Sequence, residues 1–140
     1  MIDTVKTEES KKVTTYDLQG KENGWLQELF VEDGKTHAYL TAAKPGAFKG
    51  YHLHQIRAAR YLCLKGEMKI ILYVNGIREE HILSAENKKR LYIPPNTPTG
   101  LENIGNEEAW LINYPNPPYD PSLKDEQVDY TEEQLEKGVK

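Results

Sequence analysis

The sequence predicts an all-β protein, a sandwich or barrel of short strands that ends in one short helix. Three observations support this fold class. Seven strand-like runs follow one another, Gly, Asn, Asp or Pro separates them, and a helix-start signal occurs only in the tail. We expect a polar extension over residues 1–12, a barrel over 13–123 and a helical tail over 124–140.

Each predicted strand is rich in β-branched or aromatic residues and is bounded by a turn. An Asp33-Gly34 turn joins the first two runs, and an Asn75-Gly76 turn joins the fourth and fifth. Proline closes the last two runs. The runs are Trp25–Val31, Thr36–Ala42, Arg60–Leu64, Met68–Val74, Ile77–Leu83, one within residues 89–96 and one within residues 107–115.

The tail carries the signals of a short helix. Thr131 with Gln134 three residues later forms a capping box, in which each side chain accepts a hydrogen bond from the other residue's backbone N–H. Gly138 stands where such a helix would end. We expect this helix to pack on the outside of the barrel.

Size and composition limit the function classes. A chain of 140 residues with 38% hydrophobic and 29% charged residues suits one globular domain. A net charge of -4 argues against a nucleic-acid partner. The single cysteine, Cys63, lies in an apolar run and is expected to be buried and inert. No apolar stretch approaches the roughly 20 residues that span a bilayer. The polar start lacks a secretory signal, so a cytoplasmic protein is expected.

The segment "GAFKGYHLHQ" contains a His-x-His pair, His52 and His54. On a strand these two side chains share a face, and Lys49, Arg57 and Arg60 lie near them in sequence. Such a pair can bind a metal, act as an acid or base, or lie on the surface of an edge strand. Spacing alone leaves these alternatives open.

Two segments resemble the two sequence motifs of the cupin superfamily, whose members are double-stranded β-helix (jelly-roll) barrels. The first is "GAFKGYHLH" with the following glycine, and the second is "IPPNTPTGLENIG". The matching residues are Gly46, His52, His54 and Gly66 in the first motif, and Pro95 and Asn103 in the second. The resemblance implies a cupin barrel.

The cupin motifs also imply a metal site, and here the sequence departs from them. The glutamate ligand should stand at position 58 or 59, where the chain has Ala58 and Ala59, and the second-motif histidine is replaced by Thr99. Only two of four ligands remain, whereas a divalent metal normally has three or four protein ligands. We expect a cupin that works without a metal or another cofactor.

Four segments in order resemble the group of dTDP-4-dehydrorhamnose 3,5-epimerase, the RmlC-like cupins. They are "DLQGKENGWLQELF", "FKGYHLHQ", "YIPPNTPTGLENIG" and "NPPYDP", and the similarity covers about residues 15–123. The resemblance implies an enzyme of nucleotide-sugar and polysaccharide biosynthesis that acts on a dTDP-4-keto-6-deoxyhexose type of substrate. It also implies a homodimer formed through an exchanged amino-terminal strand.

By this resemblance His52 is the general base and Tyr119 the general acid. A carbon next to a ketone is a weak acid, so a base with a pKa near ambient pH suits its deprotonation. The enolate then needs a cation or donor at its oxygen, and an acid must return the proton on the opposite face. The candidates for substrate contacts are Lys49, Arg57, Arg60, Glu28, Tyr61 and Asn103.

Some epimerase residues have no direct counterpart. The lysine that faces the enolate aligns with Ala59, so Arg57 or Arg60 would have to replace it, and Lys49 stands where the group has an arginine. For the aspartate that orients the base, Asp129 is one candidate in the tail. His54 also fits a sugar 3,4-ketoisomerase, in which two histidines move a proton through an enediol. A non-catalytic cupin that binds a sugar or another small ligand is the third hypothesis.

Overall fold

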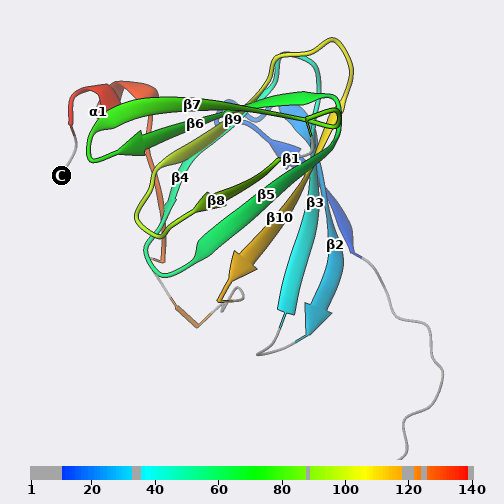
Figure 1. Cartoon of the computed structure of the whole chain (residues 1–140), viewed down its shortest axis with the longest axis horizontal. Coiled ribbons are helices and arrows are strands. Elements are labelled where there is room, and N and C mark those ends of the chain that lie inside the picture. Colours follow the sequence, from blue (N-terminus) through cyan, green and yellow to red (C-terminus); the bar gives the residue numbers. More distant parts are fainter. Residues whose placement is uncertain (1–10, 33–35, 88, 118–121, 124–125, 139–140) are drawn as a thin grey trace, which may run out of the picture.

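The computed structural model describes residues 11–32, 36–87, 89–117, 122–123 and 126–138. These residues form two antiparallel sheets and one short helix (Figure 1). In spatial order, the six-stranded sheet contains β1 (Lys12–Tyr16), β2 (Glu22–Glu32), β3 (Thr36–Ala43), β10 (Ala109–Asn116), β5 (Ala58–Lys65) and β8 (Arg90–Ile93). The five-stranded sheet contains β11 (Gln127–Asp129), β4 (Phe48–His54), β9 (Thr99–Asn103), β6 (Glu67–Val74) and β7 (Ile77–Ser84).

The chain passes repeatedly from one sheet to the other, which is the topology of a jelly-roll barrel. The predicted all-β architecture is therefore confirmed. All seven predicted runs are strands, several of them one to three residues longer than predicted, and β4 carries the histidine pair. Four strands, β1, β4, β9 and β11, lie outside the seven predicted runs, and of these β4 contains the His-x-His pair that was considered on a strand. The described part of the chain contains no helix long and apolar enough to cross a membrane.

The hydrophobic core fills one end of the barrel. Alternate residues of β6 point inward and meet side chains from the other sheet, and all of them are at most 4% exposed. The cluster consists of Ala43, Cys63, Met68, Ile70, Leu72, Leu83, Ile93, Ala109 and Leu111. Burial also raises the pKa of the Cys63 thiol, as expected for an inert cysteine. Leu111 also lines the cavity that occupies the rest of the barrel, so the cavity begins where this core ends.

The tail forms a helix and, in addition, a strand. The helix α1 (Glu132–Glu136) begins with the predicted Thr131–Gln134 capping box, in which both reciprocal hydrogen bonds are present. Leu135 packs with Ile71 and Tyr73 of β6 on the outer face of the five-stranded sheet. Before the helix, β11 pairs with β4 and so extends the barrel wall. The segment expected to be a helical tail therefore contributes directly to the barrel.

At the amino end, β1 pairs with β2 of the same chain. Residues 1–10, which make up most of the predicted polar extension, lie outside the described residues.

Candidate active site

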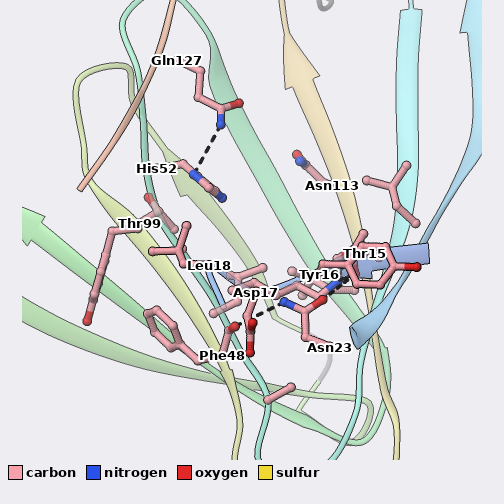
Figure 2. A pocket seen from close by; sticks show the side chains of 18 of the residues that line it. Thr15, Tyr16, Asp17, Leu18, Asn23, Phe48, His52, Thr99, Asn113 and Gln127 are labelled. Atoms are coloured by element: carbon pink, nitrogen blue, oxygen red, sulfur yellow. Dashed lines mark hydrogen bonds between the residues drawn. The ribbon is translucent and has the colours of Figure 1, made fainter. Parts of the chain in front are cut away.

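A cavity of about 1120 Å³ lies between the two sheets. Its walls come from β3, β10 and β5 on one side and from β4 and β9 on the other, while the β1–β2 turn and the tail border its opening (Figure 2). This volume is slightly above the roughly 300–1,000 Å³ of small-molecule sites. The cavity is large enough for a ligand of nucleotide-sugar size.

A bulge in β4 determines which of its side chains face this cavity. Lys49 pairs with Leu101 and His52 pairs with Thr99, so three steps along β4 match two steps along β9. Gly50 at the bulge has φ +137°, and a Cβ there would lie 2.8 Å from the Gly100 Cα. Without the bulge, side chains three residues apart would face opposite sides. With it, Lys49, His52 and His54 all line the cavity.

His52 forms a close pair with Asp129. Strand β11 places Asp129 directly opposite His52 on β4, and Nδ1 of the imidazole lies 2.7 Å from Oδ1 of the carboxylate. The hydrogen bond from Gln127 and then that of His52 outweigh burial and lower the pKa of Asp129, so the group is a carboxylate at neutral pH. A carboxylate only accepts hydrogen bonds, whereas the Gln127 amide nitrogen, 3.3 Å from the same Nδ1, only donates. The carboxylate is much closer, so Nδ1 of His52 carries the proton and the Gln127 amide donates to Asp129 at 3.0 Å. Nε2 is then left with a lone pair, as a general base requires.

His54 has a different environment, although it lies on the same face. An Nη of Arg57 lies 2.8 Å from Nδ1 of His54, and Oε1 of Glu126 lies 3.1 Å from the same nitrogen. Burial and the positive charge of Arg57 lower the pKa of His54, which favours the neutral imidazole. Arg57 can only donate and lies closer to Nδ1 than the Glu126 carboxylate does, so in the neutral state Nδ1 accepts and Nε2 carries the proton. His54 is therefore a hydrogen-bond donor through Nε2, whereas His52 is an acceptor.

Glu126 connects His54, Arg57 and the backbone of residues 56–57 at this side of the cavity. Its carboxylate accepts from Nε of Arg57 at 2.9 Å and from the backbone N–H groups of Ile56 and Arg57. Burial alone would raise the pKa of Glu126, but these donors lower it. The side chains of Arg57 and Glu126 are only 13% and 8% exposed. The charge of Arg57 is thus neutralised by a buried partner, even though the residue lines the cavity.

Lys49 is a cation deep in the cavity. Its Nζ donates to the hydroxyls of Thr15 and Thr41 at 2.9 and 3.1 Å. Burial lowers the pKa of Lys49 to about 8, with Glu108 acting weakly in the opposite direction. Among the described residues, no carboxylate forms an ion pair with it. Lys49 therefore offers a positive charge to an anionic or partly negative ligand atom.

The predicted substrate contacts divide into two groups. Lys49, Arg57 and Tyr61 line the cavity, and burial raises the pKa of Tyr61 to about 12, so its phenol stays protonated. Arg60 does not: it is exposed on β5 and stacks on the ring of Tyr92, with 5.0 Å from its guanidinium carbon to the ring centroid. Arg60 lies outside the cavity lining because neighbouring residues of a strand face opposite sides and Ala59 and Tyr61 face the cavity.

Asn103 and Glu28 also lie away from the cavity lining. Asn103 is 2% exposed, and its side-chain amide donates to the backbone carbonyls of Ala43 and Glu107 at 2.9 and 2.8 Å. It ties strands together instead of contacting a ligand. Glu28 on β2 pairs with Tyr39, which lines the cavity, but Glu28 itself does not. Tyr119, the predicted general acid, lies outside the described residues.

The donor set does not fit the metal site of the cupin motifs. Within the described residues, no group of three or more His, Cys, Asp or Glu side chains is placed to hold a metal ion. Ala58 and Ala59 line the cavity without offering a ligand atom, and Thr99 stands opposite His52.

Sequence reasoning missed two residues that contact the histidine pair and only suggested a third. Glu126 and Gln127 carry no motif, and Asp129 was one candidate among several acidic residues of the tail. The available signal is the spacing of two between Gln127 and Asp129, which places both on one face of a strand. That signal becomes readable only once residues 127–129 are known to be a strand.

Comparisons with known proteins agree with this fold. The family model described as "Polysaccharide biosynthesis C-terminal domain" matches residues 19–127. The chain is 27% identical over 131 residues to the "probable low-salt glycan biosynthesis epimerase Agl13" of Haloferax volcanii, covering 82% of this chain and 84% of that protein.

Two solved structures have the same fold. The capsular polysaccharide assembling protein CapF of Staphylococcus aureus superimposes with a TM-score of 0.71 at 22% identity, over 84% of this chain and 34% of that one. This chain thus spans about a third of the length of CapF. A cupin-2 domain protein of Rhodospirillum rubrum, Rru_A2000, gives a TM-score of 0.71 at 15% identity, over 96% and 84% of the two chains.

The structural similarity confirms the predicted cupin jelly-roll barrel. The family match covers most of the barrel, from the β1–β2 turn to the first residue of β11. The chain therefore belongs to the polysaccharide biosynthesis C-terminal domain family, and the prediction of an RmlC-like cupin related to the nucleotide-sugar epimerases is confirmed.

Proposed function

We propose that this protein is a sugar epimerase of polysaccharide biosynthesis, and that its substrate is a nucleotide-linked 4-keto-6-deoxyhexose. The observation that carries the proposal is the 2.7 Å pair of His52 and Asp129 at the wall of a cavity large enough for such a substrate. Membership of a polysaccharide biosynthesis family and the similarity to a protein named as an epimerase support the reaction class.

In this proposal His52 removes a proton from a carbon next to the ketone. Asp129 holds Nδ1–H, so Nε2 is the acceptor, and the carboxylate stabilises the imidazolium that forms. The electron pair of the broken C–H bond becomes the double bond of the enolate, and negative charge develops on the ketone oxygen. Return of a proton to the opposite face of the same carbon gives the epimer.

The developing charge needs a cation, and Lys49 suits this role better than the arginines expected from the sequence. Arg60 lies away from the cavity, and the charge of Arg57 is satisfied by Glu126. Lys49 lines the same cavity as His52 because of the β4 bulge, and it is held by two neutral hydroxyls. An uncompensated, partly buried cation stabilises an oxyanion more strongly than an exposed one.

His54 favours a second candidate, a sugar 3,4-ketoisomerase on the same substrate class. It lines the cavity beside His52 and presents a donor nitrogen where His52 presents an acceptor. A base and a donor on one face could move a proton between C3 and the neighbouring oxygen through an enediol. The opposite roles of the two nitrogens also fit an epimerase in which His54 only binds a substrate oxygen.

The test is incubation with dTDP- and UDP-linked 4-keto-6-deoxyglucose in D2O, followed by NMR. Deuterium next to the ketone with inversion at that carbon supports epimerisation, whereas a ketone moved from C4 to C3 identifies the ketoisomerase. A His52→Asn variant should lose both exchange and product. Binding of the nucleotide sugars without any exchange in the wild type would contradict catalysis and identify a non-catalytic sugar-binding cupin. Homodimer formation and cytoplasmic location remain predictions.

A further inference from the structure

The cavity wall opposite His52 carries a row of three polar side chains. Tyr39 on β3, Asn113 on β10 and Tyr61 on β5 are directly opposite one another in the strand register, and all three line the cavity. Residues paired in this way share a face of the sheet. Figure 2 shows His52 and Asn113 entering the cavity from different sheets. A ligand bound between the sheets therefore meets His52 on one side and this row on the other.

Tyr39 differs from the other two residues because it has a buried histidine as its partner. Nδ1 of His37 lies 3.0 Å from the Tyr39 hydroxyl, and the two residues share a face of β3. His37 is 7% exposed. A buried imidazole that contacts the phenol of a cavity tyrosine forms a second His-containing pair across from His52 and Asp129.

We propose that Tyr39 is the general acid on the face of the sugar opposite His52, and that His37 is its positioning residue. This inference rests on the proposed epimerase function. It assigns the second proton transfer to Tyr39 on the six-stranded sheet, whereas the sequence resemblance assigns it to Tyr119. Epimerisation by a two-base route needs proton-transfer groups on opposite faces of the carbon, and one group from each sheet meets this need.

His52 takes the proton from the carbon, and the electron pair forms the enolate. The Tyr39 O–H then gives its proton to that carbon from the other face, the enolate double bond supplies the electrons of the new C–H bond, and the ketone is restored. The phenolate left behind accepts a hydrogen bond from Nδ1–H of His37, which stabilises its charge. His52 releases its proton to water, and Tyr39 takes one from water.

Tyr61 is the neighbouring phenol and is the less suitable acid. Burial raises its pKa to about 12, and no described residue forms a hydrogen bond with its hydroxyl that would stabilise a phenolate. A phenol without such a partner releases its proton reluctantly. Tyr39 has its partner in place before the substrate binds.

The experiment measures a ratio within one reaction in D2O: inverted product formed, divided by deuterium found in recovered substrate of unchanged configuration. Both arise from the same enolate, so the ratio does not depend on folding yield or substrate affinity. A Tyr39→Phe enzyme should still exchange through His52, while its ratio falls on the order of 100-fold or more. His37→Ala should lower the ratio partially, and His37→Asn, which can still donate to Tyr39, should restore part of it.

Tyr61→Phe and Tyr119→Phe test the two alternative acids, and the inference expects each to keep the wild-type ratio even where its overall rate falls. Tyr92→Phe is the matched control, because Tyr92 is an exposed phenol on β8 outside the cavity lining. If the ratio falls in Tyr119→Phe and stays at the wild-type value in Tyr39→Phe, the inference is overturned and the acid is Tyr119. Equal loss of exchange and inversion in Tyr39→Phe would also overturn it, because Tyr39 would then serve binding or folding. A wild-type enzyme that exchanges no proton of either keto sugar would instead refute the proposed function, and the inference with it.

Discussion

Replacing Asp129 with asparagine should disable His52 without removing it. The carboxylate accepts the Nδ1 proton over 2.7 Å and so keeps the lone pair on Nε2. An asparagine amide can donate to Nδ1 instead, which moves the imidazole proton to Nε2, the wrong nitrogen for a base. The substitution removes a charge but hardly changes side-chain volume, so the effect should appear in the chemical step.

The size of the effect follows from the interaction that is lost. A hydrogen bond to a charged group contributes about 1.5–3 kcal/mol, and the imidazolium formed in the transition state would lose that contribution. At about 1.4 kcal/mol per factor of ten, the loss corresponds to a rate about 10- to 150-fold slower. The two side chains are 44% and 60% exposed, so solvent weakens the pair and the lower part of this range is expected.

The assay is the rate of deuterium incorporation into a nucleotide 4-keto sugar, with kcat and KM determined separately. The loss should fall on kcat, because the pair acts through His52 and not on substrate binding. Asp17→Asn is the matched control: Asp17 also lines the cavity, but its carboxylate accepts from the backbone of the β1–β2 turn, which asparagine supports equally well. Exchange by Asp129→Asn within about twofold of wild type, or a loss confined to KM, would refute the reasoning.

Lys49, Asn103 and Glu126 provide three further tests. Since the pKa of Lys49 is lowered to about 8, activity should fall as the pH rises through about 8, and Lys49→Arg should keep its activity to higher pH; coincident pH profiles would contradict the oxyanion role. The pKa of Lys49 is about 8 in the folded protein and 10.5 in the unfolded chain, so burial of the charged lysine destabilises the fold at every pH below about 8. This destabilisation is fully present at pH 7, and Lys49→Met should therefore raise the melting temperature. Asn103→Ala should lower the free energy of unfolding in urea by about 2–4 kcal/mol, because it removes two buried donors, while kcat of the folded enzyme stays within about twofold. Glu126→Gln should lower the free energy of unfolding at pH 7 by about 3–5 kcal/mol, because it breaks a buried ion pair with Arg57. Because the pKa of Glu126 lies below 4.5, the wild type should keep this stabilisation above that pH and lose it only as the pH falls further, which melting curves against pH would check.

Local patterns in the sequence were sufficient for most of the fold. Strand type and turn position depend on neighbouring residues, so the runs around Asn75-Gly76 and the Thr131 capping box were found correctly. Strands β1, β9 and β11 were missed because they are only three to five residues long. Such short strands carry too few alternations for a pattern to be recognised, and they are stabilised by the strand beside them.

The candidate site shows the same division between local and non-local information. The sequence by itself determined that His52 and His54 share a face, because strand alternation is a property of consecutive residues. Arg60 is near these histidines in sequence, but strand alternation turns its side chain outward, onto the ring of Tyr92. Asn103 occupies a cupin motif position, but its side chain holds strands together by donating to the backbone of Ala43.

Only the tertiary structure decided which charges serve the site. A bulge that depends on the close approach of β4 and β9 turns Lys49 into the same cavity as His52. The carboxylate that fixes the tautomer of His52 comes from Asp129, 77 residues along the chain. Alternation is a property of each strand, so sequence can predict it, whereas register and bulges depend on pairing between distant segments, and no local pattern encodes that pairing.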